Sequence, residues 1–479
     1  MRKQRALVLG GGGAVGAYQA GVLKVLCKRL IEEDRRKGDN NEYDNDGKPL
    51  LFDIIAGTSI GAMNGAVLLS QYLKTGSWET AAEQLVQFWT DKEKGLASTV
   101  SYEDLKGAGW DKWHEQSDKG TTGIASAEAA RRYYSLKHYF FHGAPKVHAP
   151  VKDFPKKDSR YFDPLNSWYM HSSDRLKNTI LNFAEPRIAT KYEKNEPRLL
   201  VFSVNAAEGK TVTFDSYFKA NGSRTSEYGK YYNNNDEHDG ITIDHVMASG
   251  TLPEFYDYKE IDGRKFWDGG LLSNTPFREL LQAYQEYWMD AVSSQTEKEG
   301  NNNNTLIPDL EVFIVNLHPP KRKDLLTDHD VVKDRVNDII FGDRSSLHDE
   351  KMAHLVADLK DFAIQMKNLS AEAISKVRQE SDKKKLEKEF DATLAVRTTT
   401  TTAANKGFND NIENPTSTYD DLLKNQFRIT KVVRIEKGER ADYNYYADSI
   451  SGKSGDFTDK TIDALIEEGK RDATDASLV

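Results

Sequence analysis

The stretch Leu50-Leu-Phe-Asp-Ile-Ile-Ala-Gly-Thr-Ser-Ile-Gly61 decides the fold, because an apolar run passes directly into a turn bounded by glycines. Residues 50–56 are apolar apart from one aspartate, which is typical of a strand that is covered on both faces. The residues after the turn are mostly apolar and predict a helix that continues to about Leu73. Strand, sharp turn and helix in this order are typical of a sheet with parallel strands.

A second unit of the same kind precedes this one. Residues 6–9 predict a short buried strand, residues 10–13 are four glycines, and residues 14–31 carry apolar side chains at helical spacing. The polar segment 35–48 is interpreted as a surface loop that leads into the next strand. Two successive units of this kind predict an α/β fold.

The rest of the chain predicts further strands and then a change of character. Asp262-Gly263 is a strong hairpin signal. From about residue 321 the sequence is charged and helical, and the apolar stripe from Met352 to Met366 is expected to be a packing face. Asp456 is expected to cap a helix over residues 457–471. The further predicted strands are residues 199–204, 211–214, 255–261, 264–267, 310–316 and, at an edge, 426–435.

Composition excludes several classes of protein. Among 479 residues, 66 are Lys or Arg and 75 are Asp or Glu, which gives a net charge of −9. A nucleic-acid partner is not expected, because such proteins usually carry a basic patch or domain. The single cysteine, Cys27, excludes an intramolecular disulfide and a cysteine-ligated zinc site. His138 and His142 have no identifiable third ligand, so neither a metal nor another cofactor is expected.

Two features bear on membranes and location. No apolar run approaches the ~20 residues of a membrane-spanning helix. The apolar run that follows the basic residues 1–5 is too short for a signal peptide. We therefore expect a soluble cytoplasmic chain whose contact with lipid, if it has one, is peripheral. The aromatic-rich segment of about residues 95–175 is interpreted as an insertion, either a lid or lipid-facing cap or a loop packed on the core. The oligomeric state is left open.

Residues 57–61 have the G-x-S-x-G pattern of a nucleophile elbow, with Ser59 at its centre. In such an elbow the serine lies between a strand and a helix, and its backbone conformation lifts the hydroxyl clear of the sheet. Glycine is needed two residues before and two after the serine, because larger side chains would collide in the tight turn. The N-terminus of the following helix adds partial positive charge near the hydroxyl. The alternative is that Ser59 only caps that helix.

Two uses fit the glycine-rich residues 10–16, which join the first strand to the first helix. The spacing of Gly11, Gly13 and Gly16 suits a dinucleotide, but the acidic residue expected at the end of a second strand is missing. The same geometry makes an oxyanion hole, because successive N–H groups at a helix N-terminus point at an anion. Beside a nucleophilic serine, the second use is the more coherent.

A nucleophilic serine needs a base, and Asp268 is the first candidate. Asp268 follows the hairpin at Asp262-Gly263 and precedes two glycines that leave room beside its carboxylate. The alternative for Asp268 alone is a solvent-exposed turn residue. Ser59, Asp268 and His318 also occur in the chain order of an α/β-hydrolase triad, and His318 directly follows a predicted strand.

These motifs together resemble the patatin-like phospholipase family, which has a glycine-rich oxyanion loop, a G-x-S-x-G elbow and a D-G-[AG] motif in this order. In this chain they are Gly11–Gly16, Gly57–Gly61 and Asp268–Gly270, and the segments 16–23 and 248–253 are also similar to the family. Many members carry Arg or Lys at the place of Val15. This departure weakens any inference that the substrate is an anionic phospholipid. 

The resemblance implies a fold and an activity. It implies a three-layer α/β/α acyl hydrolase domain over residues 1–320, which contains the aromatic-rich insertion. Residues 321–479 resemble a mainly helical C-terminal region of some bacterial members and are expected to pack on the core. The implied substrate is a lipid or similar amphiphilic ester. 

The implied mechanism is a serine–aspartate dyad without histidine. Asp268 accepts the proton of Ser59, Ser59 attacks the ester carbonyl, and the acyl-enzyme is hydrolysed. The implied oxyanion donors are the backbone N–H groups of Gly11, Gly12 and Gly13. The implied motif glycines are Gly16, Gly57, Gly61, Gly269 and Gly270. 

Three other functions stay open on the sequence. The first is a carboxylesterase that uses a Ser59–Asp268–His318 triad. The second is a nucleotide-binding protein that uses Gly11–Gly16. The third is a catalytically silent interaction scaffold, because the C-terminal third of the chain is helical and charged.

Overall fold

The computed structural model describes two compact units, each formed from several segments of the chain. The larger unit comprises Gln4–Leu280, Glu311–Ser346 and Lys431–Val479, and the smaller comprises Met1–Lys3, Leu281–Leu310 and Leu347–Thr430. The predicted boundary at residue 320 stays a prediction. The described residues are 3–37, 50–99, 135, 139, 143–151, 169–217, 240–299, 307–318, 321, 329–342, 345–394, 427–437 and 455–478.

The main sheet has eight strands in the order β12-β11-β1-β2-β6-β10-β9, with β7 paired to β6 beside this path. β1, β2 and β6 are parallel, whereas β7 and β10 are antiparallel to β6, and β9 is antiparallel to β10. The sheet is therefore mixed, because the parallel units at the start of the chain are followed by hairpins. Its strands are β1 (Gln4–Leu9), β2 (Ile54–Thr58), β6 (Arg198–Asn205), β7 (Lys210–Asp215), β9 (Lys259–Ile261), β10 (Arg264–Asp268), β11 (Leu310–Asn316) and β12 (Ile429–Glu436).

Helices flank this sheet, as expected for an α/β/α fold. α2 packs on β2 and β6 on one side and on α3 on the other, so that most of its side chains are buried. α1 packs on α3 and on α15. The elements of the larger unit beside the sheet are η1 (Gly13–Gly16), α1 (Ala17–Lys37), α2 (Ile60–Thr75), α3 (Trp78–Thr90), β3 (Ala149–Pro150), β4 (His171–Ser172), α7 (Asp174–Leu181), β5 (Arg187–Ile188), η3 (Tyr192–Lys194), β8 (Ile241–Thr242), α8 (Ile243–Ser249), η4 (Gly269–Leu271), α10 (His329–Phe341) and α15 (Asp459–Asp475).

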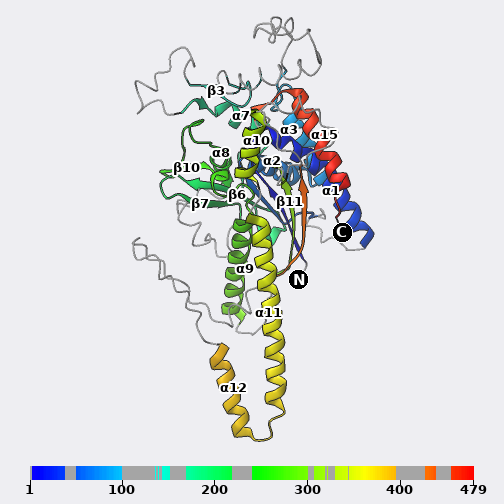
Figure 1. Cartoon of the computed structure of the whole chain (residues 1–479), viewed down its shortest axis with the longest axis vertical. Helices are drawn as coiled ribbons and strands as arrows, with labels where there is room; N and C mark the ends of the chain where they lie inside the picture. Colours follow the sequence, from blue (N-terminus) through cyan, green and yellow to red (C-terminus); the bar gives the residue numbers. More distant parts are fainter. Residues whose placement is uncertain are drawn as a thin grey trace, which may run out of the picture. The chain divides into compact units, whose positions relative to one another are not determined.

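α15 lies directly against α1, although more than 400 residues separate them in the chain (Figure 1). Two glycines allow the close approach. A Cβ atom on Gly21 would lie 2.0 Å from the carbonyl oxygen of Ile466, and one on Gly469 would lie 2.1 Å from that of Tyr18. The contact also carries a hydrogen bond of 2.9 Å from the Tyr18 hydroxyl to Asp472. The C-terminal helix is thus part of the same unit as the first helix.

Several element predictions are confirmed and one needs correction. The hairpin at Asp262-Gly263 and the strand over 310–316 are confirmed. Thr458, and not Asp456, is the N-cap of the last helix. Asp456 instead accepts hydrogen bonds from Thr458 and Thr461, which fix the turn before the helix.

The smaller unit holds the long helical elements, and here one packing prediction was wrong. The apolar stripe of α11 is exposed, with exposed fractions of 44% for Met352, 58% for Leu359 and 62% for Phe362. None of the described helices combines the length and the apolar character needed to cross a membrane. Most of the aromatic-rich segment lies outside the described residues. The helices α9 (Phe277–Glu299), α11 (Ser345–Ser375) and α12 (Glu380–Leu394) belong wholly or mainly to this unit.

Candidate active site

Ser59 lies on a strained turn between β2 and α2. Its backbone has φ 55° and ψ −126°, a conformation that L-residues rarely adopt. The turn is tight enough to require glycine, because a Cβ on Gly61 would lie 2.2 Å from the carbonyl oxygen of Leu9. The Ser59 side chain makes no capping hydrogen bond to α2. The structure therefore has the geometry of an elbow and not that of a simple helix cap.

Asp268 reaches the same edge of the sheet from the other side of β6. Thr58, the last residue of β2, pairs with Phe202 of β6, and Asp268, the last residue of β10, pairs with Ser203. Neighbouring strands are about 4.8 Å apart. The two registers thus bring Ser59 and Asp268 to one level of the sheet, with a single strand between them.

The Ser59 side chain lies close enough to the Asp268 carboxylate to lower its pKa. The carboxylate accepts a hydrogen bond of 2.7 Å from the N–H of Gly270. Asp268 is only 2% exposed, which excludes a solvent-exposed turn residue. Gly269 allows this burial, because a Cβ there would lie 2.4 Å from the carbonyl oxygen of Phe202.

Burial raises the pKa of Asp268 to about 6, although Ser59 and the hydrogen bond from Gly270 lower it. Loss of water disfavours the charged carboxylate, and these two groups stabilise it. At neutral pH the group is still mainly ionised. It is also a stronger base than an ordinary aspartate, which suits proton abstraction from a hydroxyl.

A cluster of ring side chains lies near Asp268, and the Asp268 charge acts on the pKa of two of its members, Tyr139 and Tyr256. The cluster consists of Tyr139, His148, His171, Phe255 and Tyr256. The pKa of Tyr139 is raised to about 12. Burial is the largest cause, a hydrogen bond with Tyr256 lowers the pKa, and the Asp268 carboxylate raises it. Burial also lowers the pKa of His148 to about 3. Tyr139 and His148 are therefore both neutral at the pH at which Asp268 titrates. Ring centroids in the cluster are 4.4 to 6.0 Å apart.

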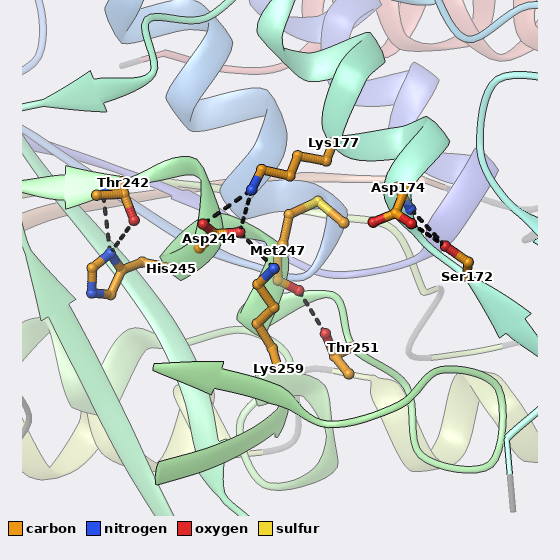
Figure 2. Close-up of polar contacts among 9 residues, drawn as sticks. All are labelled: Ser172, Asp174, Lys177, Thr242, Asp244, His245, Met247, Thr251 and Lys259. Carbon is orange, nitrogen blue, oxygen red and sulfur yellow. Dashed lines mark hydrogen bonds and ion pairs between the residues drawn. The ribbon is translucent and has the colours of Figure 1, made fainter. Parts of the chain in front are cut away.

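α8 and the loop after it position both candidate residues. The Ser249 hydroxyl accepts a hydrogen bond of 2.8 Å from the N–H of Ser59. The carbonyl oxygen of Thr251 accepts one of 2.8 Å from the N–H of Asp268. α8 is itself held at its start, where Asp244 pairs with Lys177 of α7 and with Lys259 of β9 (Figure 2).

A capping box and a loop contact complete the anchoring of α8. Thr242 and His245 exchange hydrogen bonds at its N-terminus, with the His245 Nδ1 atom 3.0 Å from the Thr242 N–H (Figure 2). At its C-terminus the Thr251 hydroxyl donates to the carbonyl oxygen of Met247 at 2.9 Å. The elements that position Ser59 and Asp268 are thus fixed at both ends.

The glycine-rich loop lies against the candidate nucleophile. A Cβ on Gly11 would lie 2.8 Å from the Cβ of Ser59. Gly11 itself does not suit the predicted role of oxyanion donor, because its N–H already donates to the carbonyl oxygen of Asn274 at 3.3 Å. Gly12 and Gly13 stay the candidates for that role.

His318 lies beside the glycine-rich loop and pairs with Asp338 of α10. Its Nδ1 atom is 3.4 Å from the Asp338 carboxylate, and its Nε2 would lie 3.6 Å from a Cβ on Gly12. The carboxylate whose pKa Ser59 lowers is that of Asp268. His138 and His142 lie outside the described residues.

Sequence reasoning missed two residues that hold the site together. Ser249 belongs to the segment 248–253. The similarity of this segment to the family implied no role for the serine. Asn274 follows Asp268 by six residues, and its side chain donates to the carbonyl oxygen of Gly11 at 3.2 Å. Both act across long stretches of chain, so spacing alone gave no signal for them.

The comparison with family models agrees with the motifs. The family model described as patatin-like phospholipase matches residues 7–281, more than half of the 479 residues. One similar solved structure is the crystal structure of VipD from Legionella pneumophila, with 13% identity over 98% of this chain and 67% of that chain and a TM-score of 0.27. The comparison with curated proteins found no match.

Proposed function

Because the chain belongs to the patatin-like phospholipase family, we propose that it hydrolyses carboxylic esters of lipids with Ser59 as nucleophile and Asp268 as base. Family membership supports a lipid acyl hydrolase in general terms. The observation that carries the finer proposal is that strand register brings Ser59 and the buried Asp268 to one level of the sheet, where Ser59 lies close enough to lower the pKa of the carboxylate. Nucleophile and base within hydrogen-bond reach are the signature of covalent catalysis.

The first half-reaction forms an acyl-enzyme. Asp268 takes the proton of the Ser59 hydroxyl while the oxygen attacks the ester carbonyl, which gives a tetrahedral oxyanion. The protonated Asp268 then gives that proton to the leaving alkoxide, the C–O bond breaks and an alcohol departs. Because a carboxylate is a weak base towards a hydroxyl, the raised pKa of Asp268 and the close alignment of the pair support this step.

The second half-reaction releases the acid. A water molecule attacks the acyl carbonyl and gives its proton to Asp268. The second tetrahedral intermediate collapses, and Asp268 returns the proton to the Ser59 oxygen as the carboxylic acid leaves. In both steps the N–H groups of Gly12 and Gly13 stabilise the oxyanion, and we leave Gly11 out because its N–H bonds to Asn274.

We further propose a peripheral contact with lipid surfaces beside this site. Leu271 and Leu272 follow the Asp268 motif directly and are 44% and 56% exposed. Exposed large apolar side chains next to a site for amphiphilic esters suit insertion among lipids. Replacement of both by serine is expected to reduce pelleting with phosphatidylcholine vesicles while hydrolysis of a soluble ester is kept. Unchanged pelleting would exclude this contact.

The central test combines labelling with hydrolysis. A fluorophosphonate is expected to label the protein at Ser59, and Ser59→Ala is expected to lose both the label and the hydrolysis of phospholipids, glycerides and chromogenic esters. Asp268→Asn is expected to lose activity while His318→Ala keeps it. The reverse pattern would select the triad with His318. Stabilisation by a dinucleotide without serine reactivity would select nucleotide binding at Gly11–Gly16, and the absence of all three signals would select a silent scaffold.

A further inference from the structure

Three side-chain amides hold carbonyl groups of the glycine-rich loop. We call this set, Gln19, Asn64 and Asn274, the amide clamp. The Gln19 Nε2 atom donates to the carbonyl oxygen of Gly10 at 2.8 Å, the Asn274 Nδ2 atom to that of Gly11 at 3.2 Å, and the Asn64 Nδ2 atom to that of Gly16 at 3.0 Å.

Gln19 and Asn64 form one buried hydrogen-bonded chain. The indole N–H of Trp89 donates to the Asn64 Oδ1 atom at 2.9 Å, and the Asn64 Nδ2 atom donates to the Gln19 Oε1 atom at 2.8 Å. Gln19 and Asn64 are both fully buried. A buried polar chain with every member bonded is rigid, because breaking one bond leaves groups without water or partner. The clamp therefore rests on a fixed support in α1, α2 and α3.

Asn274 contacts the loop through both its backbone and its side chain. Its carbonyl oxygen accepts from the Gly11 N–H at 3.3 Å, and its Nδ2 atom donates to the carbonyl oxygens of Gly11 and of Phe341, the latter at 2.8 Å. The Oδ1 atom would lie 2.6 Å from a Cβ on Gly11, so a larger residue could not take that position. Asn274 thus holds both the N–H group and the carbonyl group of Gly11.

The geometry of the peptide group converts these contacts into an orientation of the loop N–H groups. A trans peptide is planar, with the C=O of one residue and the N–H of the next pointing in opposite directions. The bond from Asn274 to the Gly11 carbonyl therefore fixes the direction of the Gly12 N–H. The Gly12 carbonyl accepts from the Val15 N–H at 3.2 Å, which fixes the Gly13 N–H in the same way.

We propose that Asn274 is a positioning residue for the oxyanion hole: by holding the Gly11 carbonyl it directs the Gly12 N–H to the substrate, with Gln19 and Asn64 supporting the same loop. This inference rests on the proposed ester hydrolysis. A peptide plane that turned at Gly11 would present a carbonyl oxygen to the developing oxyanion in place of a donor. The clamp prevents this turn before substrate arrives, which is the preorganisation that such a site needs.

The test replaces the donors and keeps the size of the side chains. Asn274→Asp removes the amide donor of Asn274. Gln19→Met removes a second of the three amides while it keeps the side chain at nearly the same length. Gln71→Met is the matched control, because the Gln71 side chain also donates to a backbone carbonyl, that of Phe183, but outside the loop. Each variant is assayed on a soluble chromogenic ester, and thermal melting verifies that it is folded.

Asn274→Asp and Gln19→Met are expected to lower kcat by ~10- to 100-fold with KM changed less than ~2-fold, because the interaction acts on the transition state. Gln71→Met is expected to keep kcat. Hydrogen exchange is the readout besides activity: the loop amides of residues 10–16 are expected to exchange faster in Asn274→Asp than in the wild type. If Gln19→Met does not fold, Asn274→Asp decides alone.

The outcomes separate the clamp from the proposed function. A wild type that hydrolyses esters, together with an Asn274→Asp variant of unchanged kcat, overturns the clamp alone. So does a rise in KM at constant kcat. A wild type without hydrolysis or fluorophosphonate labelling overturns the proposed function, and unchanged loop exchange in Asn274→Asp then overturns the clamp as well.

Discussion

Ser59 lowers the pKa of Asp268 although β2, which ends just before Ser59, and β10, which ends at Asp268, do not pair with each other. β6 lies between them, parallel to β2 and antiparallel to β10. The relative position of the two side chains therefore depends on two independent registers along one strand. A shift of one residue in either register would turn a side chain to the opposite face of the sheet.

The first prediction concerns the pH dependence of hydrolysis. Asp268 acts as base only when it is ionised, and burial raises its pKa to about 6. We expect kcat/KM on a soluble ester to be constant above this pH and to fall about tenfold per unit below it. A profile that is flat between pH 5 and pH 8 would contradict this assignment. His318→Ala is the control and is expected to leave the inflection in place.

The second prediction concerns the cost of the buried carboxylate. The pKa of Asp268 is about 6 in the folded protein, against its ordinary value of 3.8. The folded state thus binds the proton of Asp268 more tightly than the unfolded state does. The contribution of this group to the free energy of unfolding is therefore complete below the unfolded pKa and is lost as the pH rises through about 6. At pH 8 the loss amounts to about 3 kcal/mol, from 1.36 kcal/mol per unit.

Asp268→Asn removes this charge and is expected to raise the free energy of unfolding at pH 8, with little effect near pH 4. Denaturant unfolding at the two pH values measures the difference. Ser59→Ala is the control, because it keeps the carboxylate. An Asp268→Asn variant that loses stability at pH 8 would show that the carboxylate is stabilised by contacts stronger than the burial penalty.

The third prediction compares two glycines. Gly61→Ala would place a Cβ 2.2 Å from the carbonyl oxygen of Leu9, whereas a Cβ on Gly209 meets nothing within 4 Å. We expect Gly61→Ala to cost about 3 kcal/mol or more and to remove fluorophosphonate labelling, because β1 must move away from the elbow. Gly209 has φ +63°, so Gly209→Ala is expected to cost about 1 to 2 kcal/mol through backbone strain alone. Equal effects in thermal or denaturant unfolding would disprove the role of close approach.

The fourth prediction concerns the ion pair between Arg198 and Asp215 at the start of β6. The Arg198 Nε atom is 3.0 Å from the Asp215 Oδ1 atom, and the arginine is 1% exposed. We expect Asp215→Ala to cost about 3 to 5 kcal/mol, because the buried guanidinium then loses the Asp215 carboxylate as counterion. Glu83→Ala, which breaks the exposed pair with Lys24, is expected to cost about 0 to 1 kcal/mol. A similar cost for both changes would contradict the role of burial.

The sequence predicted the elements that depend on local pattern. The turn at residues 57–61, the hairpin at Asp262-Gly263 and the strand over 310–316 all follow from glycine placement and apolar runs, and the structure has them. Ser59 and Asp268 were singled out for the same reason, since each directly follows a predicted strand and stands beside glycines. Local rules of backbone geometry were sufficient for these.

Contacts between distant segments could not be predicted in the same way. The N–H of Gly11 is used by Asn274, which lies 263 residues further along the chain, so the oxyanion role of Gly11 looked plausible from the loop alone. The apolar stripe of α11 has the spacing of a packing face, but spacing does not say whether another element covers it, and it is exposed. The last helix begins at Asp459 because Thr458 has the cap conformation, although Asp456 has the preferred side chain nearby.

The contact of α15 with α1 has a consequence for how the protein is made. α1 follows the glycine-rich loop, and it packs against residues 459–475, which a ribosome synthesises more than 400 residues later. Until those residues emerge, the backbones at Gly21 and Tyr18 have no partner helix to meet. The nascent chain therefore carries Ser59 and Asp268 before the unit around them is complete, and the proposed hydrolysis has to wait until residues 459–475 have been made.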